Sequence, residues 1–451
     1  MVLHSLSNVA AISVEFNPTR VLCEMHLPNA QIKWITPAVL KIIHTSDWHL
    51  GHQLHGYDRQ YEHQVFLDWL KQCLIDEQAD ALLVAGDVFD TANPPASAWR
   101  MLYRFLADIA KALPHLNVVI TGGNHDSPSK LDAPHELLKA FDLHLIGAIA
   151  RDNDGRLDTE RMMVPITDNS GETAAWILAV PFLRSGDLRT EGLGEEDDRL
   201  IEGVRQVYQQ TEQAARAKCK GMQALIAMGH VYMASGELSE MSERRILGGN
   251  QHALPADIFS DDVAYVALGH LHLAQQVAKQ TRIRYCGSPL PLSLSERHYR
   301  HQVLAVTLEG NQLQSVTPHI VPRAVDLWRV PEKASPLDTV LASLAALAPQ
   351  DLPLAQQPLL DVPVLLDKPQ PMLREKILAV LEDKPVRLAK ITPHYRETSQ
   401  DTGFRQQHLS DVEPFQVLRH GWQQKYQGEP DEALSATFSH LLEQLEQDED
   451  Q

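Results

Sequence analysis

Five short apolar runs recur in the first two thirds of the chain, and polar side chains follow each run at once. The runs are four or five residues long and mostly β-branched, Leu or Ala, which is typical of strands buried on both faces. They are Leu40–Ile43, Ala81–Ala85, Asn117–Ile120, Ala224–Met228 and Ala264–Leu268. Because the carboxyl ends of parallel strands meet at one edge of a sheet, we expect the polar side chains to converge there.

Helical patterns alternate with these runs over residues 39–325. Apolar residues recur at helical spacing in Glu62–Ile75 and Ser97–Leu113. The stretches 151–172 and 184–200 are rich in Asp, Glu, Gly and Arg, which predicts loops. Further strands are expected at Trp176–Pro181, Ile283–Cys286 and Gln302–Thr307. The pattern predicts a sheet-rich α/β domain with helices outside.

A second, smaller α+β unit is predicted over residues 331–392, with no ligand cluster of its own. Its expected elements are a helix, a strand, a helix and a strand, at Pro336–Leu347, Leu359–Leu366, Pro371–Leu381 and Val386–Ile391. Two roles remain open for this unit: shaping a groove beside the main site, or adding stability. Residues 393–409 are polar and predict a linker.

The two ends of the chain give weaker patterns. Residues 1–38 lack the basic start and apolar core of a secretory signal, and we expect them to be disordered or to precede the natural start. Residues 410–446 begin with a capping box at Ser410–Glu413 and predict two amphipathic helices. This hairpin either docks on the parent domain or binds a partner protein.

Composition narrows the classes of function. A chain of 451 residues favours two or three domains. A net charge of −19 argues against coating nucleic acid by bulk attraction, so a polyanionic substrate needs local cations, metals or a partner. No run approaches the ~20 apolar residues that span a bilayer. Four scattered cysteines without a CxxC pair fit free thiols in a reducing cytoplasm.

The polar residues after the five runs are of the kinds that bind divalent metals. They are Asp47 and His49, Asp87, Asn124 with His125 and Asp126, His230, and His270 with His272. Oxygen and imidazole ligands without Cys suit manganese, iron or zinc. Two metals ~3.5–4 Å apart activate water and clamp a phosphoryl group, and they need a bridging carboxylate. Asp87 is the best candidate because it follows a glycine at a strand end.

A purely structural interpretation treats these residues as loop carboxylates and core histidines. The presence of metal-binding residue types after all five predicted strands argues against it. The stretches Ile42–Gly51, Val84–Thr91 and Tyr285–Pro289 resemble motifs of the calcineurin-like metallophosphoesterases. Among these, the likeness is to the nuclease subunits of bacterial DNA repair complexes, and it covers roughly residues 40 to 445. It implies a metallophosphoesterase β-sandwich flanked by helices, a capping α+β domain and a helical hairpin.

The resemblance also implies residue roles. One metal ion would be held by Asp47, His49, Asp87 and His272. The other would be held by Asp87, Asn124, His230 and His270. His125 would be the catalytic histidine, and Asp126 would orient it. The family's preferred ion is manganese.

The resemblance further implies a partner and substrates. The partner would be an SMC-type ATPase, and the nuclease would form a homodimer within a two-fold heterotetramer. Substrates would be DNA ends, hairpins and single strands, cut as a 3′→5′ double-strand exonuclease and an endonuclease in repair, recombination and replication. The alternatives are a metallophosphoesterase for small substrates that works without an ATPase, and a scaffold that only binds the ATPase and DNA.

Several nearby residues receive structural interpretations. We expect His44 to pack against the sheet. For His52, His55 and His63 a solvated surface position is preferred over contact with the substrate. For Asp90 a helix cap is preferred over a contact with a metal ligand. Tyr57, Arg59 and Gln60 line either a DNA-approach loop or an ordinary exposed loop.

Overall fold

The computed structural model describes residues 38–152, 154–168, 170–189, 196–234 and 253–396, together with Arg419, Trp422, Leu434 and Phe438. The predicted extension before residue 38, most of the linker and nearly all of the hairpin at 410–446 therefore lie outside the described residues. None of the helices in the described ranges combines the length and apolar character that crossing a bilayer requires.

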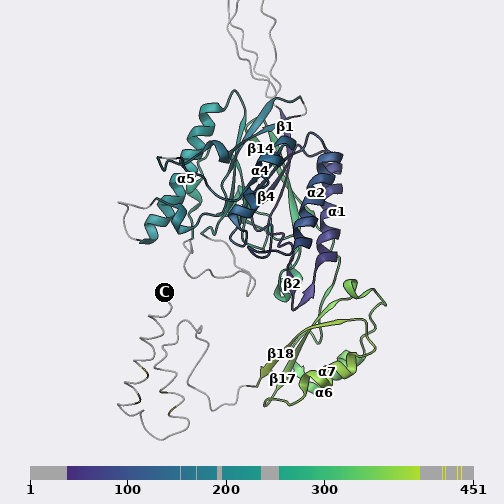
Figure 1. Ribbon diagram of the computed structural model, residues 1–451. Coiled ribbons are helices and arrows are strands. Elements are labelled where there is room, and N and C mark those ends of the chain that lie inside the picture. Colours follow the sequence, from purple (N-terminus) through teal and green to yellow (C-terminus); the bar gives the residue numbers. More distant parts are fainter. Residues whose placement is uncertain are drawn as a thin grey trace, which may run out of the picture.

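Two six-stranded sheets form the main domain (Figure 1). The first has the order β14-β13-β1-β4-β5-β6, and the second has the order β11-β12-β10-β9-β8-β7. The strands of the first sheet are β1 (Val39–Thr45), β4 (Ala81–Ala85), β5 (Asn117–Thr121), β6 (Leu143–Ile146), β13 (Gln302–Glu309) and β14 (Gln312–Ile320). Those of the second are β7 (Met163–Thr167), β8 (Thr173–Ala179), β9 (Ala224–His230), β10 (Val263–Gly269), β11 (Gln275–Val277) and β12 (Gln280–Tyr285).

The five strands that lead into the polar segments are buried on both faces over most of their length, which explains the continuous apolar runs. In β1, Ile42 belongs to the core between the sheets, whereas Ile43 belongs to the core under the helices. Helices α1 (Gln60–Glu77) and α2 (Ala96–Ala112) supply the other side of that second core. Helix α5 (Glu196–Lys218) contacts β8 and β9 on the opposite side of the domain (Figure 1). The short helices α3 (Pro128–Asp132) and α4 (His135–Leu138) follow β5.

The pairing of the strands brings their carboxyl ends together. β1, β4 and β5 are parallel neighbours, with Thr45 opposite Val84 and Ala85 opposite Thr121. β9 and β10 are also parallel, with His230 opposite Gly269. The polar segments that follow these five strands therefore emerge at corresponding edges of the two sheets, as the sequence predicted.

A smaller α+β unit follows the sandwich (Figure 1). Its sheet contains β15 (Leu327–Arg329), β16 (Ser335–Pro336), β17 (Leu359–Leu366) and β18 (Arg387–Tyr395), and every pair is parallel. Helices α6 (Leu337–Ala345) and α7 (Leu373–Leu381) pack on this sheet around a separate apolar core.

A seam joins the two regions. The hairpin of β2 (Gln53–Leu54) and β3 (Tyr57–Asp58) leaves the segment after β1 and reaches the α+β unit. Leu54 packs there with Leu327 and Leu359. The Tyr57 hydroxyl donates a hydrogen bond to the Leu388 carbonyl at 3.2 Å. We call this contact region, with Leu294 and Val325, the seam.

Three sequence expectations need correction. β7 lies within 151–172, which was predicted to be a loop; it is an edge strand that pairs only with β8. Helix α5 begins at Glu196, inside the second predicted loop, because its polar residues cover the solvent side while Val204 and Tyr208 are buried. β18 runs to Tyr395, so the first residues of the predicted linker belong to a strand.

Candidate metal centre

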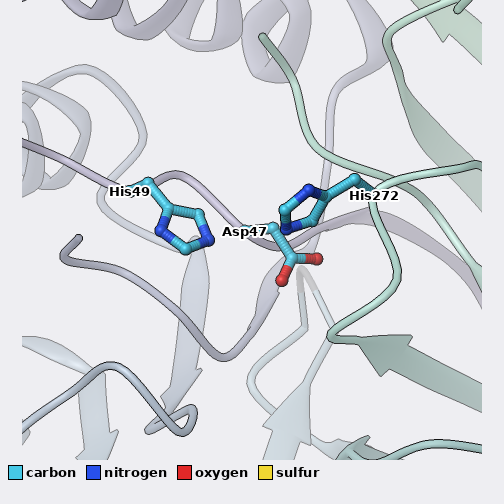
Figure 2. Close-up of side chains that lie close together, drawn as sticks. All are labelled: Asp47, His49 and His272. Carbon is cyan, nitrogen blue, oxygen red and sulfur yellow. The ribbon is translucent and has the colours of Figure 1, made fainter. Parts of the chain in front are cut away.

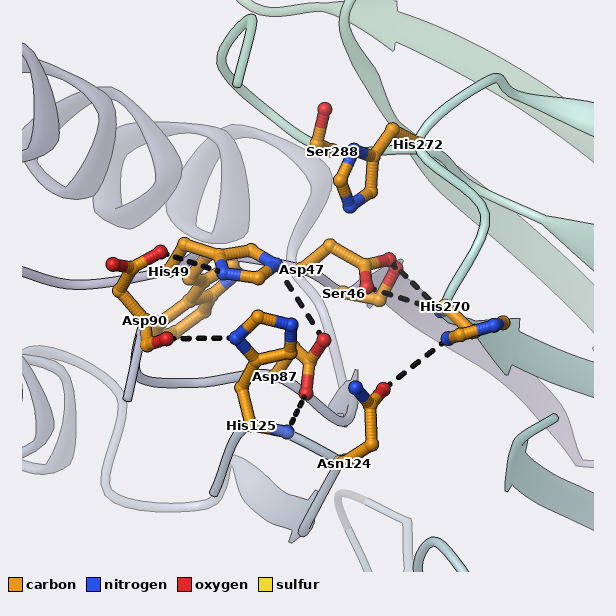
Figure 3. A network of polar contacts seen from close by, with 12 residues as sticks. Ser46, Asp47, His49, Asp87, Asp90, Asn124, His125, His270, His272 and Ser288 are labelled. Carbon is orange, nitrogen blue, oxygen red and sulfur yellow. Dashed lines mark hydrogen bonds and ion pairs between the residues drawn. The ribbon is translucent and has the colours of Figure 1, made fainter. Parts of the chain in front are cut away.

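The structure brings the seven predicted ligands to one place at the edge of the sandwich. Figure 3 labels all of them except His230. Four come from the first sheet: Asp47 and His49 after β1, Asp87 after β4, and Asn124 after β5. Three come from the second sheet: His230 at the end of β9, and His270 and His272 after β10. The site is therefore built across the two sheets.

Two overlapping groups of ligand atoms form within this cluster. Asp47, His49 and His272 each offer one atom, and these atoms lie within 4.8 Å of one another (Figure 2). Asp47, Asp87 and His230 form a second group by the same measure. The Asp87 Oδ2 atom lies 3.5 Å from His49 Nε2 and 3.3 Å from His230 Nε2. Asp87 therefore stands between histidines of both groups.

Asn124 and His270 complete the side of the cluster that contains His230. The Asn124 Oδ1 atom lies 3.0 Å from His230 Nε2 and 3.2 Å from His270 Nδ1. The backbone N–H of His270 donates to Asp47 Oδ1 at 3.0 Å. An amide oxygen surrounded by two imidazoles is a suitable neutral ligand for a divalent ion.

The backbone at the ligands is unusual. Asp47, His49, Asp87 and His270 have φ values of 54°, 46°, 48° and 100°, in the left-handed region that non-glycine residues rarely adopt. Each such residue costs about 1–3 kcal/mol and persists only where its surroundings hold it. Here the Asp47 N–H donates to the Gly86 carbonyl and the His49 N–H to the Asp87 carbonyl, both at 3.0 Å. These bonds tie the two ligand segments together.

Two glycines, Gly86 and Gly269, allow the ends of neighbouring strands to approach each other closely. Gly86 has a φ of 85°, and a Cβ there would lie 2.1 Å from His230 Nδ1. A Cβ on Gly269 would lie 1.8 Å from the carbonyl oxygen of Ala85, which is backbone. Glycine at 269 therefore allows the end of β10 to approach the end of β4.

The charged groups of the centre shift each other strongly. Burial alone would raise the pKa of Asp87, but His230, His49 and His125 hold it well below its usual range. Burial disfavours charge on His230, yet the Asp87 carboxylate raises its pKa to about 9. Burial and the neighbouring His230 lower the pKa of His270 to about 3. Asp87 thus stays a carboxylate and attracts positive charge.

The donor set fits divalent metal ions. His49 Nε2 is buried and has no hydrogen-bond partner among the residues described, although it faces the Asp87 carboxylate. A buried nitrogen without a partner costs free energy, and a metal ion would satisfy it. Carboxylates, an amide and imidazoles without thiolate match the chemistry of a manganese, iron or zinc site.

In three of the candidate ligand histidines, the Nδ1 atom contacts an oxygen acceptor on the side away from the cluster. The partner of His49 is Asp90 Oδ1 at 3.2 Å, and that of His272 is Glu296 Oε1 at 3.2 Å. His230 Nδ1 contacts the Ala85 carbonyl at 2.9 Å. Such acceptors fix a proton on Nδ1 and leave the Nε2 lone pair for a metal.

His125 lies beside the cluster, but its orientation differs from the expectation. Its backbone N–H donates to Asp87 Oδ1 at 2.9 Å, and its Nδ1 contacts the Asp90 carbonyl at 2.7 Å (Figure 3). The Asp126 carboxylate instead accepts backbone N–H groups of Gly123 at 2.8 Å and Phe89 at 2.9 Å. Asp126 therefore joins two of the candidate ligand segments, and the group that contacts His125 Nδ1 is the Asp90 carbonyl and not the Asp126 carboxylate.

Of three further interpretations from the sequence, the one for His44 agrees with the structure and those for His63 and Asp90 do not. His44 packs inside as expected, with Nδ1 2.9 Å from the Tyr265 hydroxyl. His63 is buried and its Nε2 contacts the Trp48 carbonyl at 3.0 Å, so the surface interpretation was wrong. Asp90 does not cap α2, which begins at Ala96 after Pro95.

Some residues at the centre gave no usable signal in the sequence. The sequence favours a helix cap for Asp90, and no motif draws attention to Glu296. Phe182 and Arg184 lie at the rim: the Phe182 ring is 6.2 Å from that of His230, and the Arg184 guanidinium is 5.4 Å from the Phe182 ring. The Arg184 side chain also contacts the Asp126 carbonyl at 3.4 Å.

Comparisons with known families agree with this site. Residues 40–274 match the family model of the calcineurin-like phosphoesterases. Residues 323–426 match a family model described as the type 5 capsule protein repressor C-terminal domain. The sandwich is thus a domain of the calcineurin-like phosphoesterase class, which implies divalent metal ions.

Relatives of known identity narrow the class further. The SbcCD nuclease of Rhodobacter capsulatus has a D subunit that is 40% identical over 379 residues, which cover 83% of this chain and 92% of the relative. Its counterpart in Escherichia coli K12 is 34% identical over 355 residues, covering 77% and 83%. For the counterpart in Bacillus subtilis the identity is 35% over 271 residues, covering 59% and 66%.

The chain belongs to the SbcD family, the D subunits of SbcCD nucleases. The predicted family and fold class are confirmed. Solved structures align less closely: a protein of Thermus thermophilus gives a TM-score of 0.33 at 14% identity, over 63% of this chain and all of its own.

Proposed function

We propose that this chain is the nuclease subunit of an SbcCD-type complex and hydrolyses DNA phosphodiester bonds with two divalent metal ions, manganese being the expected ion. The observation that carries the proposal is the convergence of seven candidate ligand side chains from five strand ends, six of them gathered about the carboxylate of the seventh, Asp87. Membership of the SbcD family supports the choice of a nuclease over other phosphoesterases.

Each metal position would draw on both sheets. The first would use Asp47, His49, Asp87 and His272, and the second would use Asp87, Asn124, His230 and His270. When bound, the ions would supply Lewis-acid activation of water and neutralise charge on the phosphoryl oxygens. Asp87 suits the shared position because its Oδ2 lies within 3.5 Å of a histidine from each set.

His125 is the group proposed to act on the phosphate. Its Nδ1 is committed to the Asp90 carbonyl at 2.7 Å, which leaves Nε2 for the substrate. Nε2 would protonate the leaving oxygen or hold a phosphoryl oxygen by a hydrogen bond. Burial lowers the pKa of His125, so a nearby phosphate charge would be needed to favour its protonated form.

The α+β unit is the proposed cap over the DNA. Between residues 327 and 396 it carries nine Lys and Arg against eight Asp and Glu, so it is close to neutral in a chain of net charge −19. A region without excess negative charge suits a neighbouring polyanion better than the rest of the chain does. Arg184 at the rim adds a local cation beside the proposed site.

An SbcC-like SMC-type ATPase is the proposed partner, and residues 410–446 are its proposed binding segment. With it the chain would form a homodimer within a two-fold heterotetramer that acts on double-stranded and hairpin DNA. The proposed activities are 3′→5′ exonuclease, hairpin opening and single-strand endonuclease, in repair, recombination and replication. The partner would supply DNA affinity that an acidic subunit lacks.

One assay tests the function. Cleavage of a hairpin DNA and of a simple phosphodiester is measured with manganese, with and without the ATPase, for wild type and His125→Ala. We expect hairpin cleavage by the complex and a loss of about 10²–10⁴-fold in His125→Ala. Cleavage of the small ester alone would favour a small-substrate phosphoesterase, and cleavage of neither would leave only a scaffold.

The proposed partner contact has its own test. A chain lacking residues 410–451 should keep the metal affinity of the full chain, because all seven proposed ligands precede that segment. Its co-purification with the ATPase should fall at least tenfold. Unchanged co-purification would assign the tail to the nuclease itself.

A further inference from the structure

Glu296 is a buried carboxylate that the proposed mechanism does not yet use. It lies in the short 3₁₀ turn η5 (Leu294–His298), on a segment that follows β12. The residue is 0% exposed. An ionised carboxylate removed from water in this way costs several kcal/mol unless strong partners compensate, so its contacts identify its role.

The two oxygens of Glu296 contact different groups. Oε1 lies 3.2 Å from His272 Nδ1, and Oε2 accepts the backbone N–H of Leu292 at 2.8 Å. The second bond fixes the carboxylate against its own turn. The first oxygen is therefore held in place against the imidazole ring.

His49, the other histidine of the group that contains Asp47 and His272, also has a carboxylate next to its Nδ1 atom. His49 Nδ1 contacts Asp90 Oδ1 at 3.2 Å, whereas His230 Nδ1 contacts a neutral carbonyl, that of Ala85. His49 and His272 belong to the group that also contains Asp47. Both histidines of that group thus have a carboxylate behind them, and a carboxylate raises the basicity of the ligand nitrogen more than a neutral acceptor does.

We propose that Glu296 is a positioning residue for His272, which it holds in the tautomer with the proton on Nδ1 and Nε2 free for the first metal ion. This inference rests on the proposed metal-dependent function. It assigns to Glu296 no contact with substrate, and the effect of Glu296 on metal affinity is proposed to pass through His272.

The test measures manganese binding by calorimetry on the full chain. Glu296→Gln keeps the shape of the side chain and removes its charge. We expect its affinity for one of the two ions to fall about 10- to 100-fold, with the other unchanged. Thermal unfolding of the metal-free proteins checks that the variant is folded. Glu309→Gln, at the end of β13 and paired with the start of β1, is the control and should bind as wild type does.

A double variant tests the route through His272. If Glu296 acts only by orienting this ligand, His272→Ala with Glu296→Gln should bind manganese no more weakly than His272→Ala alone. Wild-type affinities in Glu296→Gln, or additive losses in the double variant, would overturn the inference. Wild type that binds no divalent ion would instead overturn the proposed function.

Discussion

The sandwich and the α+β unit both contain parallel strands buried by helices, but among the described residues only the sandwich has a cluster of candidate metal ligands at its strand ends. Each region also holds a buried carboxylate. Asp361 in β17 pairs with Arg329 Nη1 at 2.9 Å and accepts the Thr392 hydroxyl at 3.1 Å. Asp87 is surrounded by histidines and has no Arg or Lys partner among the described residues.

The sandwich and the α+β unit also differ in their backbone conformations. Four ligand residues of the sandwich have positive φ, whereas in the described part of the α+β unit only Met372 does among non-glycine residues. Buried parallel strands are therefore not enough to make a metal centre. The strained segments after the strands, and carboxylates left without a cationic side chain, distinguish the region that does chemistry.

The largest expected effect distinguishes the carboxylate of Asp87 from that of Asp361. Asp87→Ala should abolish manganese binding at both positions, because it removes the proposed shared ligand. Asp361→Ala should leave both binding events intact while destabilising its own unit by about 1–3 kcal/mol, since the partly exposed Arg329 loses its buried partner. Calorimetry and thermal unfolding measure the two effects. Full occupancy of both positions in Asp87→Ala would refute the assignment.

The next prediction concerns the close approach of the sheets. In Gly269→Ala the new Cβ meets the Ala85 carbonyl, so the end of β10 must move away from β4. We expect a loss of stability of about 1–3 kcal/mol or more, and weaker manganese binding. Gly186→Ala is the matched control, because a Cβ there meets nothing within 4 Å. Equal metal affinities and stabilities in both variants would show that the approach is unimportant.

Much of this centre could be predicted from the sequence because the relevant signals are local. A strand such as Ala81–Ala85 is recognisable by its length and apolar content, and the ligand Asp87 stands two residues beyond it. The supports could not be predicted, because they bring distant segments together. Asp90 lies 41 residues from His49, and Glu296 lies 24 residues from His272. No periodicity links such pairs.

The burial of polar side chains within the fold also could not be predicted from the sequence. His63 occupies one face of α1 in a polar stretch, which is typical of a solvated residue, yet it lies beneath the Trp48 carbonyl. Arg59 is also buried, with Nε 2.8 Å from Glu62 Oε1, whereas the sequence left open a DNA-approach loop or an ordinary exposed loop. Such pairs satisfy each other inside the fold, and only the packing of α1 against the ligand segment reveals it.

The smallest expected effect tests whether the two regions are independent. η5 carries Glu296 toward His272 and Leu294 toward the seam, where Leu294 packs with Leu327. Leu327→Ala should loosen this packing and lower manganese affinity by about 0.5–2 kcal/mol, or about 2- to 30-fold. The Leu327 side chain is not among the ligand groups, so the loss would travel through η5.

A core variant of the same unit controls for general destabilisation. Leu344 is buried in the separate core of the α+β unit, so Leu344→Ala should destabilise that unit by about 2–5 kcal/mol without changing metal affinity. Calorimetry on both variants distinguishes the cases. A loss of manganese affinity in Leu327→Ala but not in Leu344→Ala would mean that the packing of the α+β unit at the seam affects His272, a proposed ligand of the first metal. Equal affinities in both variants would mean that the seam only holds the regions together.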